Sequence, residues 1–219
     1  MSDATYGQLL ELAAAVSLAA SIVMLWRRSL EAIVRTLAIQ AAAIAATSLL
    51  IGLHDALVAE IVIAGIILAV KAVLIPWLLM RLLRTTTDQR VAEPALNTAA
   101  SLVIAAVLAL GAFAATTSLV QLAGGEEGRL LPVGFAIVLI AYFGLVTRRN
   151  ALTQIVGFLQ LENGIALVAL LASTGGSLLV ELGTALDLLL AVLVLQVLIV
   201  RMQSKLGGLD LDHLQELRD

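Results

Sequence analysis

The chain has 219 residues, of which 61% are hydrophobic and 13% charged, with a formal net charge of −3 and no cysteine. A soluble domain does not need so much apolar surface, so the composition predicts an all-α, polytopic membrane protein. The lack of cysteine excludes thiolate metal sites, iron–sulfur ligation and disulfides within the chain. His54 and His213 lie far apart and lack metal-ligand spacing, and no long basic run favours nucleic-acid binding.

Seven segments are long and apolar enough to cross a bilayer, which takes about 20 residues. They span residues 8–26, 32–53, 57–80, 97–123, 131–147, 153–173 and 177–200. No basic segment precedes the first of them, so we expect it to be retained as a helix rather than cleaved as a signal peptide. The longest connection, 81–96, is the one candidate internal boundary.

Basic residues are concentrated in alternate connections. The residues that follow the first, third, fifth and seventh segments, in the connection or just beyond it, include Arg27, Arg28, Arg35, Arg81, Arg84, Arg90, Arg148, Arg149, Arg201, Lys205 and Arg218. The other side has only Arg129, next to two acids. Because cytoplasmic loops are enriched in Lys and Arg, this asymmetry predicts an outside N-terminus and a cytoplasmic C-terminus.

The two halves of the chain align without a gap. A shift of 121 residues, the separation of Arg27 from Arg148, places the first arginine pair on the second and Glu60 on Glu181. We interpret this as a three-helix repeat, with residues 1–80 as the first unit, 81–130 as a linker containing the fourth helix, and 131–219 as the second unit. The alternative is that any two three-helix units with basic connections align at some shift.

Ionisable residues inside the apolar segments are the candidate functional groups. Each costs about 2.5–3.5 kcal/mol at the bilayer centre, so such residues face a protein interior or a water-filled path. Lys71, Glu162 and Asp187 are expected near mid-depth, and Glu60 and Glu181 nearer the outer face. One interpretation is a proton relay, because an apolar surrounding disfavours the charged forms of acids and lysines. The other is a set of structural pairs, such as Lys71 with Glu162 or with Asp187.

A proline follows Lys71 in the same predicted helix. Pro76 removes one backbone hydrogen bond, so we expect a kink in the inner third of this span. The carbonyl of Ala72 that is freed is then a candidate polar neighbour of Lys71.

Two segments resemble known families. Residues 147–164 (TRRNALTQIVGFLQLENG) contain an arginine pair, Gly157 and Glu162-Asn163, a pattern similar to the K subunit of respiratory complex I. Together with residues 178–195 (LLVELGTALDLLLAVLVL), they make the whole chain resemble the E membrane subunit of hydrogenase-4 and formate hydrogenlyase-type complexes.

The resemblance implies a non-catalytic subunit without cofactors, in the cytoplasmic membrane of a prokaryote. Its implied partners are antiporter-like membrane subunits and other complex I-like membrane and hydrophilic subunits, which carry iron–sulfur clusters and nickel–iron centres. The K subunit's membrane acids align with Leu159 and Ala191, each about one turn from Glu162 and Asp187. A one-turn shift keeps roughly the same helix face.

The implied function is a redox-driven pump of protons or sodium ions. Three alternatives remain: a subunit of a multi-subunit cation/proton antiporter, a structural scaffold with static charges, and a stand-alone transporter. The absence of Gly/Pro-broken half-helices argues against the last of these.

Overall fold

The computed structural model describes residues 3–85, 97–148 and 151–172, and all regular elements in these ranges are helices. In chain order they are α1 (Asp3–Trp26), α2 (Leu30–His54), α3 (Val58–Ile67), the π-helix η1 (Leu68–Leu74), α4 (Ile75–Thr85), α5 (Thr98–Ala115), α6 (Thr117–Ala123), α7 (Gly125–Arg129), α8 (Leu131–Thr147) and α9 (Ala151–Ala172). The all-α prediction is therefore confirmed for the described part of the chain.

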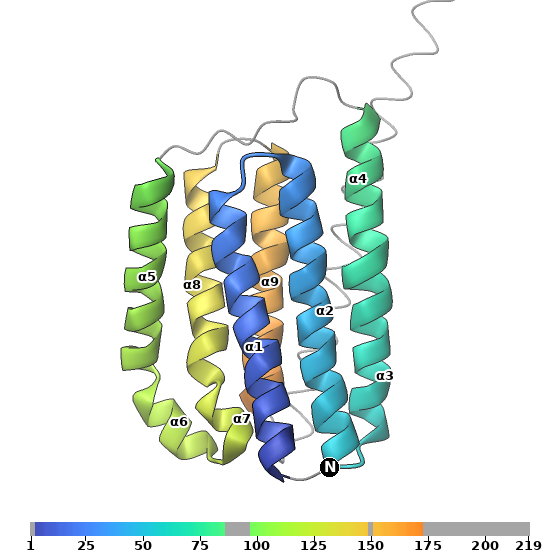
Figure 1. Ribbon diagram of the computed structural model, residues 1–219, viewed down its shortest axis with the longest axis vertical. Helices are drawn as coiled ribbons and strands as arrows, with labels where there is room; N and C mark the ends of the chain where they lie inside the picture. The colour runs from blue at the N-terminus through green and yellow to red at the C-terminus, as the bar shows by residue number, and fades with distance from the viewer. Residues whose placement is uncertain (1–2, 86–96, 149–150, 173–219) are drawn as a thin grey trace, which may run out of the picture.

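The long helices lie side by side in an up-and-down bundle (Figure 1). The centre is formed by two antiparallel pairs, α1 with α2 and α8 with α9, and the pairs also contact each other through α1–α8 and α2–α9. α5 packs on α8 at one edge, and the continuous run of α3, η1 and α4 packs on α2 at the other. Side chains of α1, α2, α4 and α9 share one apolar core cluster, which joins the central pairs to the third span.

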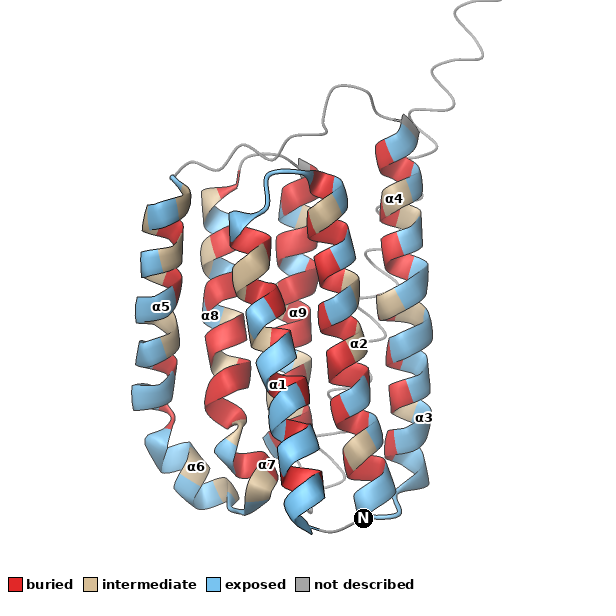
Figure 2. Cartoon of the chain, viewed as in Figure 1, coloured by how far each residue is buried: buried red, intermediate tan, exposed pale blue. Residues whose placement is uncertain are grey.

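Five of the described helices are long and apolar enough to cross a membrane, counting α3, η1 and α4 as one. α8 is a sixth, shorter apolar helix, so six of the seven predicted spans are present in the described ranges. The predicted span 177–200 lies outside the described residues. Apolar side chains are exposed on the outward faces of α3–α4 and α5 (Figure 2), as in a helix bundle surrounded by lipid or by other subunits.

The connections between helices also follow the predicted asymmetry. The α1–α2 connection, the end of α4, the start of α5, the end of α8 and the start of α9 lie at one end, here called the basic end (Figure 1). Arg129 lies at the opposite end, in α7, where it pairs with Glu126 at 3.2 Å. That the basic end faces the cytoplasm stays a prediction from the sequence.

The fourth predicted span, 97–123, is interrupted. α5 ends at Ala115, and α6 and α7 turn across the end of the bundle. The Thr116 hydroxyl donates to the Ala112 carbonyl at 2.7 Å, and Thr117 donates to the carbonyls of Phe113 and Ala114. These side-chain bonds to the preceding turn lie at the break, where Thr116 leaves helical geometry with φ −94° and ψ 4°.

Pro76 acts on the helix that precedes it. Residues 68–74 adopt wider π-helical turns, and the Ile75 N–H donates to the carbonyl of Val70, five residues earlier. The shifted ladder accommodates the proline, which has no N–H of its own. The kink expected in the inner third stays a prediction. The structure has a π-helical segment that precedes Pro76 and contains Lys71.

A tight turn joins α2 to α3 and is strained at one residue. Ala56 has a positive φ of 54°, and the Leu57 N–H donates to the Gly52 carbonyl at 2.9 Å. This is a helix end of the kind that glycine favours, because a side chain is disfavoured in the left-handed region.

We expect Ala56→Gly to raise the free energy of unfolding by about 0.5–1 kcal/mol. The relief of backbone strain exceeds the loss from the more flexible unfolded chain. Thermal unfolding of the purified chain in detergent measures it, with Ala59→Gly in the first turn of α3 as the control that should destabilise. A lower melting temperature for Ala56→Gly would contradict the prediction.

Candidate functional site

Lys71 and Glu162 meet inside the bundle. The Lys71 Nζ lies 3.3 Å from the Glu162 Oε1, and the two side chains are 6% and 3% exposed. Lys71 comes from η1, midway along the third span, and Glu162 from the middle of α9. The structure thus brings together two of the predicted site residues at mid-depth, where charges are most costly without partners.

A chain of buried amides and hydroxyls starts from this pair. Lys71 Nζ lies 3.5 Å from Asn163 Oδ1, Asn163 Nδ2 donates to Gln40 Oε1 at 3.2 Å, and Gln40 Nε2 donates to Ser21 Oγ at 2.6 Å. Ser21 in turn donates to the Ser17 carbonyl at 3.1 Å. All of these side chains are at most 6% exposed. Every donor in the series points the same way, away from Lys71.

Four spans contribute to this arrangement, here called the polar chain (Lys71, Glu162, Asn163, Gln40 and Ser21). α1 supplies the serine, α2 the glutamine, η1 the lysine, and α9 the acid and the asparagine. Gln160, one turn before Asn163 on α9, donates to the Ser21 carbonyl at 3.5 Å. Ser21 lies near the C-terminal end of α1, so the polar chain extends from the middle of the bundle toward the basic end.

Two members of the polar chain have ionisable side chains, Lys71 and Glu162. The others are amides and a hydroxyl, which donate and accept hydrogen bonds without carrying a charge. The Asn163 amide oxygen therefore helps to orient the ammonium group of Lys71. Lys71 also lies in the π-helical turns of η1, and such turns occur preferentially at functional sites.

Glu60 lies apart from the polar chain. It is buried in the first turn of α3, and Ser48 of α2 donates to its Oε2 at 3.1 Å and to its carbonyl at 3.0 Å. Asp187 and Glu181 lie outside the described residues, so their place relative to Lys71 stays a prediction. No group of three or more His, Cys, Asp or Glu able to hold a metal ion occurs among the residues that the structure describes.

A second polar cluster lies at the end opposite the basic end. The Tyr6 hydroxyl donates to Glu127 of α7, and the Tyr6 ring stacks on His54 with ring centroids 4.0 Å apart. His54 Nε2 is also 4.0 Å from an exposed oxygen of Asp3. No pattern in the sequence indicated this contact, because a tyrosine near a helix end is usual at a membrane interface.

Arg148 closes the bundle at the basic end. Its Nη2 donates to the Met24 carbonyl at 2.5 Å, and its side chain is 7% exposed. Burial lowers the pKa of this guanidinium, which nevertheless stays charged because arginine starts from a very high value. A cation at the C-terminal end of α1 is favourable for the helix dipole. The first arginine of the quoted motif therefore ties α8 to α1.

Gln40 is the link between the two halves of the polar chain. We expect Gln40→Leu to lower the free energy of unfolding by about 1–2 kcal/mol, since Asn163 and Ser21 each lose a partner in an apolar surrounding. Thermal unfolding in detergent is the measurement, and Gln8→Leu, at an exposed position of α1, is the matched control. Equal stability of Gln40→Leu and Gln8→Leu would contradict the assigned role.

Comparison with known proteins gives both full-length and partial relatives. The chain is 47% identical to the uncharacterized protein Rv0085 of Mycobacterium tuberculosis over 220 residues, covering all of both chains. It is 32% identical to hydrogenase-4 component E of Escherichia coli K12 and of Shigella flexneri over 150 residues, covering 68% of this chain and 68% of each relative. No family model matches the chain, and neither does any solved structure. The match to component E, on a chain whose described part is a bundle of apolar helices, shows that this membrane protein belongs to the hydrogenase-4 component E family.

Proposed function

We propose that this chain is a membrane subunit of an energy-converting hydrogenase or another complex I-like, redox-driven ion pump. In this role Lys71 and Glu162 take part in moving protons, or sodium ions, across the membrane. The chain packs against antiporter-like subunits, and the redox centres reside in hydrophilic partners. Asp187, and the more peripheral Glu60 and Glu181, are further candidates for the ion path.

The observation that carries the proposal is the buried pair of Lys71 and Glu162 at 3.3 Å. A lysine and an acid in contact at mid-depth can exchange a proton without either charge facing lipid. Asn163 accepts from the lysine and is itself held by Gln40. The kinship with a hydrogenase-4 component supports membership of a multi-subunit complex.

The same pair also supports a second function, that of a structural scaffold. A contact of 3.3 Å between opposite charges is what a static pair between α9 and η1 requires. Replacing both residues with apolar ones of similar size often preserves stability, whereas removing one partner does not. The double variant Lys71→Met with Glu162→Leu therefore separates the two functions: a scaffold keeps ion movement, and a pump loses it.

The assignment to a redox complex is tested by purifying the tagged full chain in mild detergent from its native host. Mass spectrometry of the co-purifying proteins is expected to find antiporter-like membrane subunits together with hydrophilic subunits that carry iron–sulfur clusters. Recovery with antiporter subunits alone would instead favour a cation/proton antiporter. A monodisperse chain without partners would contradict both assignments.

A further inference from the structure

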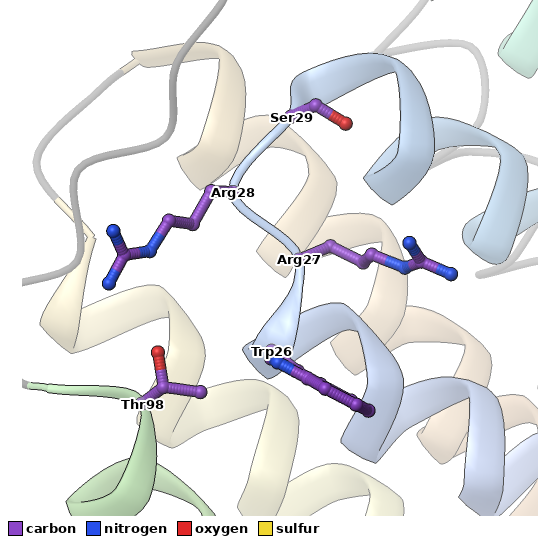
Figure 3. A pocket seen from close by; sticks show the side chains of 5 residues that line it. All are labelled: Trp26, Arg27, Arg28, Ser29 and Thr98. Atoms are coloured by element: carbon purple, nitrogen blue, oxygen red, sulfur yellow. The ribbon is translucent and has the colours of Figure 1, made fainter.

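An open cavity of about 510 Å³ lies at the basic end of the bundle and is lined by Trp26, Arg27, Arg28, Ser29 and Thr98. It lies between the α1–α2 connection and the first residue of α5 (Figure 3). The Arg28 side chain extends toward the start of α5, where the Thr98 hydroxyl lies, and Arg27 extends to the other side of the connection, above Trp26. The cavity therefore combines two cations, hydroxyl groups and an indole.

The two arginines are not neutralised within the described chain. Glu31, a nearby acid on α2, is 3.7 Å from Arg35, and no ion pair of Arg27 or Arg28 occurs among the described residues. α2 and α5 both begin beside the cavity, with Ser29 and Asn97 as their N-caps. The positive ends of two helix dipoles thus add to the charge of the two guanidinium groups.

From this geometry we propose that the cavity binds a phosphate group, carried by the headgroup of an anionic phospholipid or supplied as free phosphate. Guanidinium groups bind phosphate oxygens in a bidentate manner, and Thr98 provides an additional hydroxyl donor. The position of the cavity along the bundle favours a lipid as the source of the phosphate. Trp26 is 63% exposed at the end of a spanning helix, where membrane proteins place indoles among headgroups. Basic pockets between spanning helices are also where anionic headgroups bind.

The exposed face of α5 suits the acyl chains of such a lipid. Val103, Val107 and Leu110 are 62–72% exposed along this helix, which begins at the cavity with Thr98. A lipid whose phosphate lies between Arg28 and Thr98 can therefore place a chain against α5. The site is separate from the polar chain, so it does not depend on the proposed ion movement.

The fluorescence of Trp26, which lines the cavity, measures whether a ligand is bound there. The chain has two tryptophans, so a Trp77→Phe variant of the full chain leaves Trp26 as the single indole. Reconstituted in bilayers with brominated acyl chains, its fluorescence is expected to be quenched more by phosphatidylglycerol than by phosphatidylcholine. This preference should fall about fivefold for each arginine removed in Arg27→Gln and Arg28→Gln. In detergent, inorganic phosphate alone tests the free-phosphate source through a shift of the Trp26 emission.

Three control variants make the result specific. Arg35→Gln removes an arginine that already pairs with Glu31 at the same end and should keep the lipid preference. Arg27→Lys with Arg28→Lys retains the charge that orients the chain in the membrane, and should weaken binding only partly because ammonium groups lack the bidentate fork. Thr98→Val should weaken binding with no change of charge.

The outcomes separate the two sources. A phosphatidylglycerol preference that depends on Arg28 and Thr98 supports a lipid site, and an emission shift with phosphate alone supports a free-phosphate site. If neither ligand affects Trp26, or if Arg35→Gln reduces the preference as much as Arg28→Gln, the cavity is not a phosphate site.

Discussion

Glu162→Gln is expected to leave the complex assembled and its redox reaction active, but to reduce ion movement by roughly tenfold or more. Glutamine has nearly the same shape and can still accept a hydrogen bond from Lys71, but it does not titrate. A loss of about 1.4 kcal/mol of stabilisation in the transfer step already slows it tenfold. The measurement is the acidification of inverted membrane vesicles that contain the whole complex, with electron transfer recorded in the same sample.

Two variants provide the comparison. Glu31→Gln removes an exposed acid of α2 that pairs with Arg35, and it should leave ion movement unchanged. Glu162→Asp retains a titratable group on a shorter side chain, and it should recover part of the activity. Full ion movement by an assembled Glu162→Gln complex would assign the pair to the structural scaffold instead.

The second large effect, on stability, is expected from substitutions of Gly164, where α9 packs against α8. A Cβ at this position would lie 2.9 Å from the backbone nitrogen of Val138 and from the side chains of Ile137 and Val138. Because backbone atoms are involved, the helices must move apart. We expect Gly164→Ala to lower the free energy of unfolding by about 1–3 kcal/mol, and Gly164→Leu to prevent stable insertion of the bundle in most molecules.

Small residues allow such close approach of helices in lipid, where packing replaces the hydrophobic effect as the main attraction. Gly134 on α8 is also at a close contact with α9. A Cβ added there would lie 2.6 Å from Val168 Cγ2 and 3.1 Å from the Val168 nitrogen. A Cβ added at Gly65 or Gly111 would meet no atom within 4 Å, so alanine there is the matched control. Thermal unfolding in detergent compares the four alanine variants, and equal losses at Gly65 and Gly164 would contradict the packing argument.

Gly164 also links packing to the candidate site. It follows Glu162 and Asn163 directly in α9, so a displacement of this helix moves both polar side chains relative to Lys71. A reduced ion movement in Gly164→Ala would therefore accompany its lower stability. The double variant Lys71→Met with Glu162→Leu distinguishes the two causes. It removes the pair but should keep most of the stability, whereas Gly164→Ala should lower the melting temperature by several degrees.

Hydropathy was sufficient to locate the spans because bilayer thickness imposes a length on each apolar segment. The predicted segment 131–147 coincides with α8, Leu131–Thr147, and the first, second and sixth segments differ from α1, α2 and α9 only at their ends. The break in the helix at Thr116 was not predicted, because a threonine in an apolar run is also common within continuous spanning helices. Hydropathy reflects the apolar neighbours of Thr116 and carries no information on the local backbone geometry.

The candidate site was predictable in part. Buried charges stand out in an apolar helix, so Lys71 and Glu162 were evident, and their contact was one of the pairs considered from the sequence. The role of Gln40 and Ser21 depends on the angle between helices, which a single sequence does not encode. The three-helix repeat stays a prediction as well, because its second Glu, Glu181, lies outside the described residues.

The most direct test asks whether Glu162 changes protonation during turnover. Infrared difference spectra of the whole complex, recorded between its oxidised and reduced states, report the carboxyl C=O stretch of a membrane acid. We predict a redox-dependent carboxyl band that disappears in Glu162→Gln and persists in Glu31→Gln. A difference spectrum that is the same in wild type and Glu162→Gln would contradict the claim that the Lys71–Glu162 pair carries the proton.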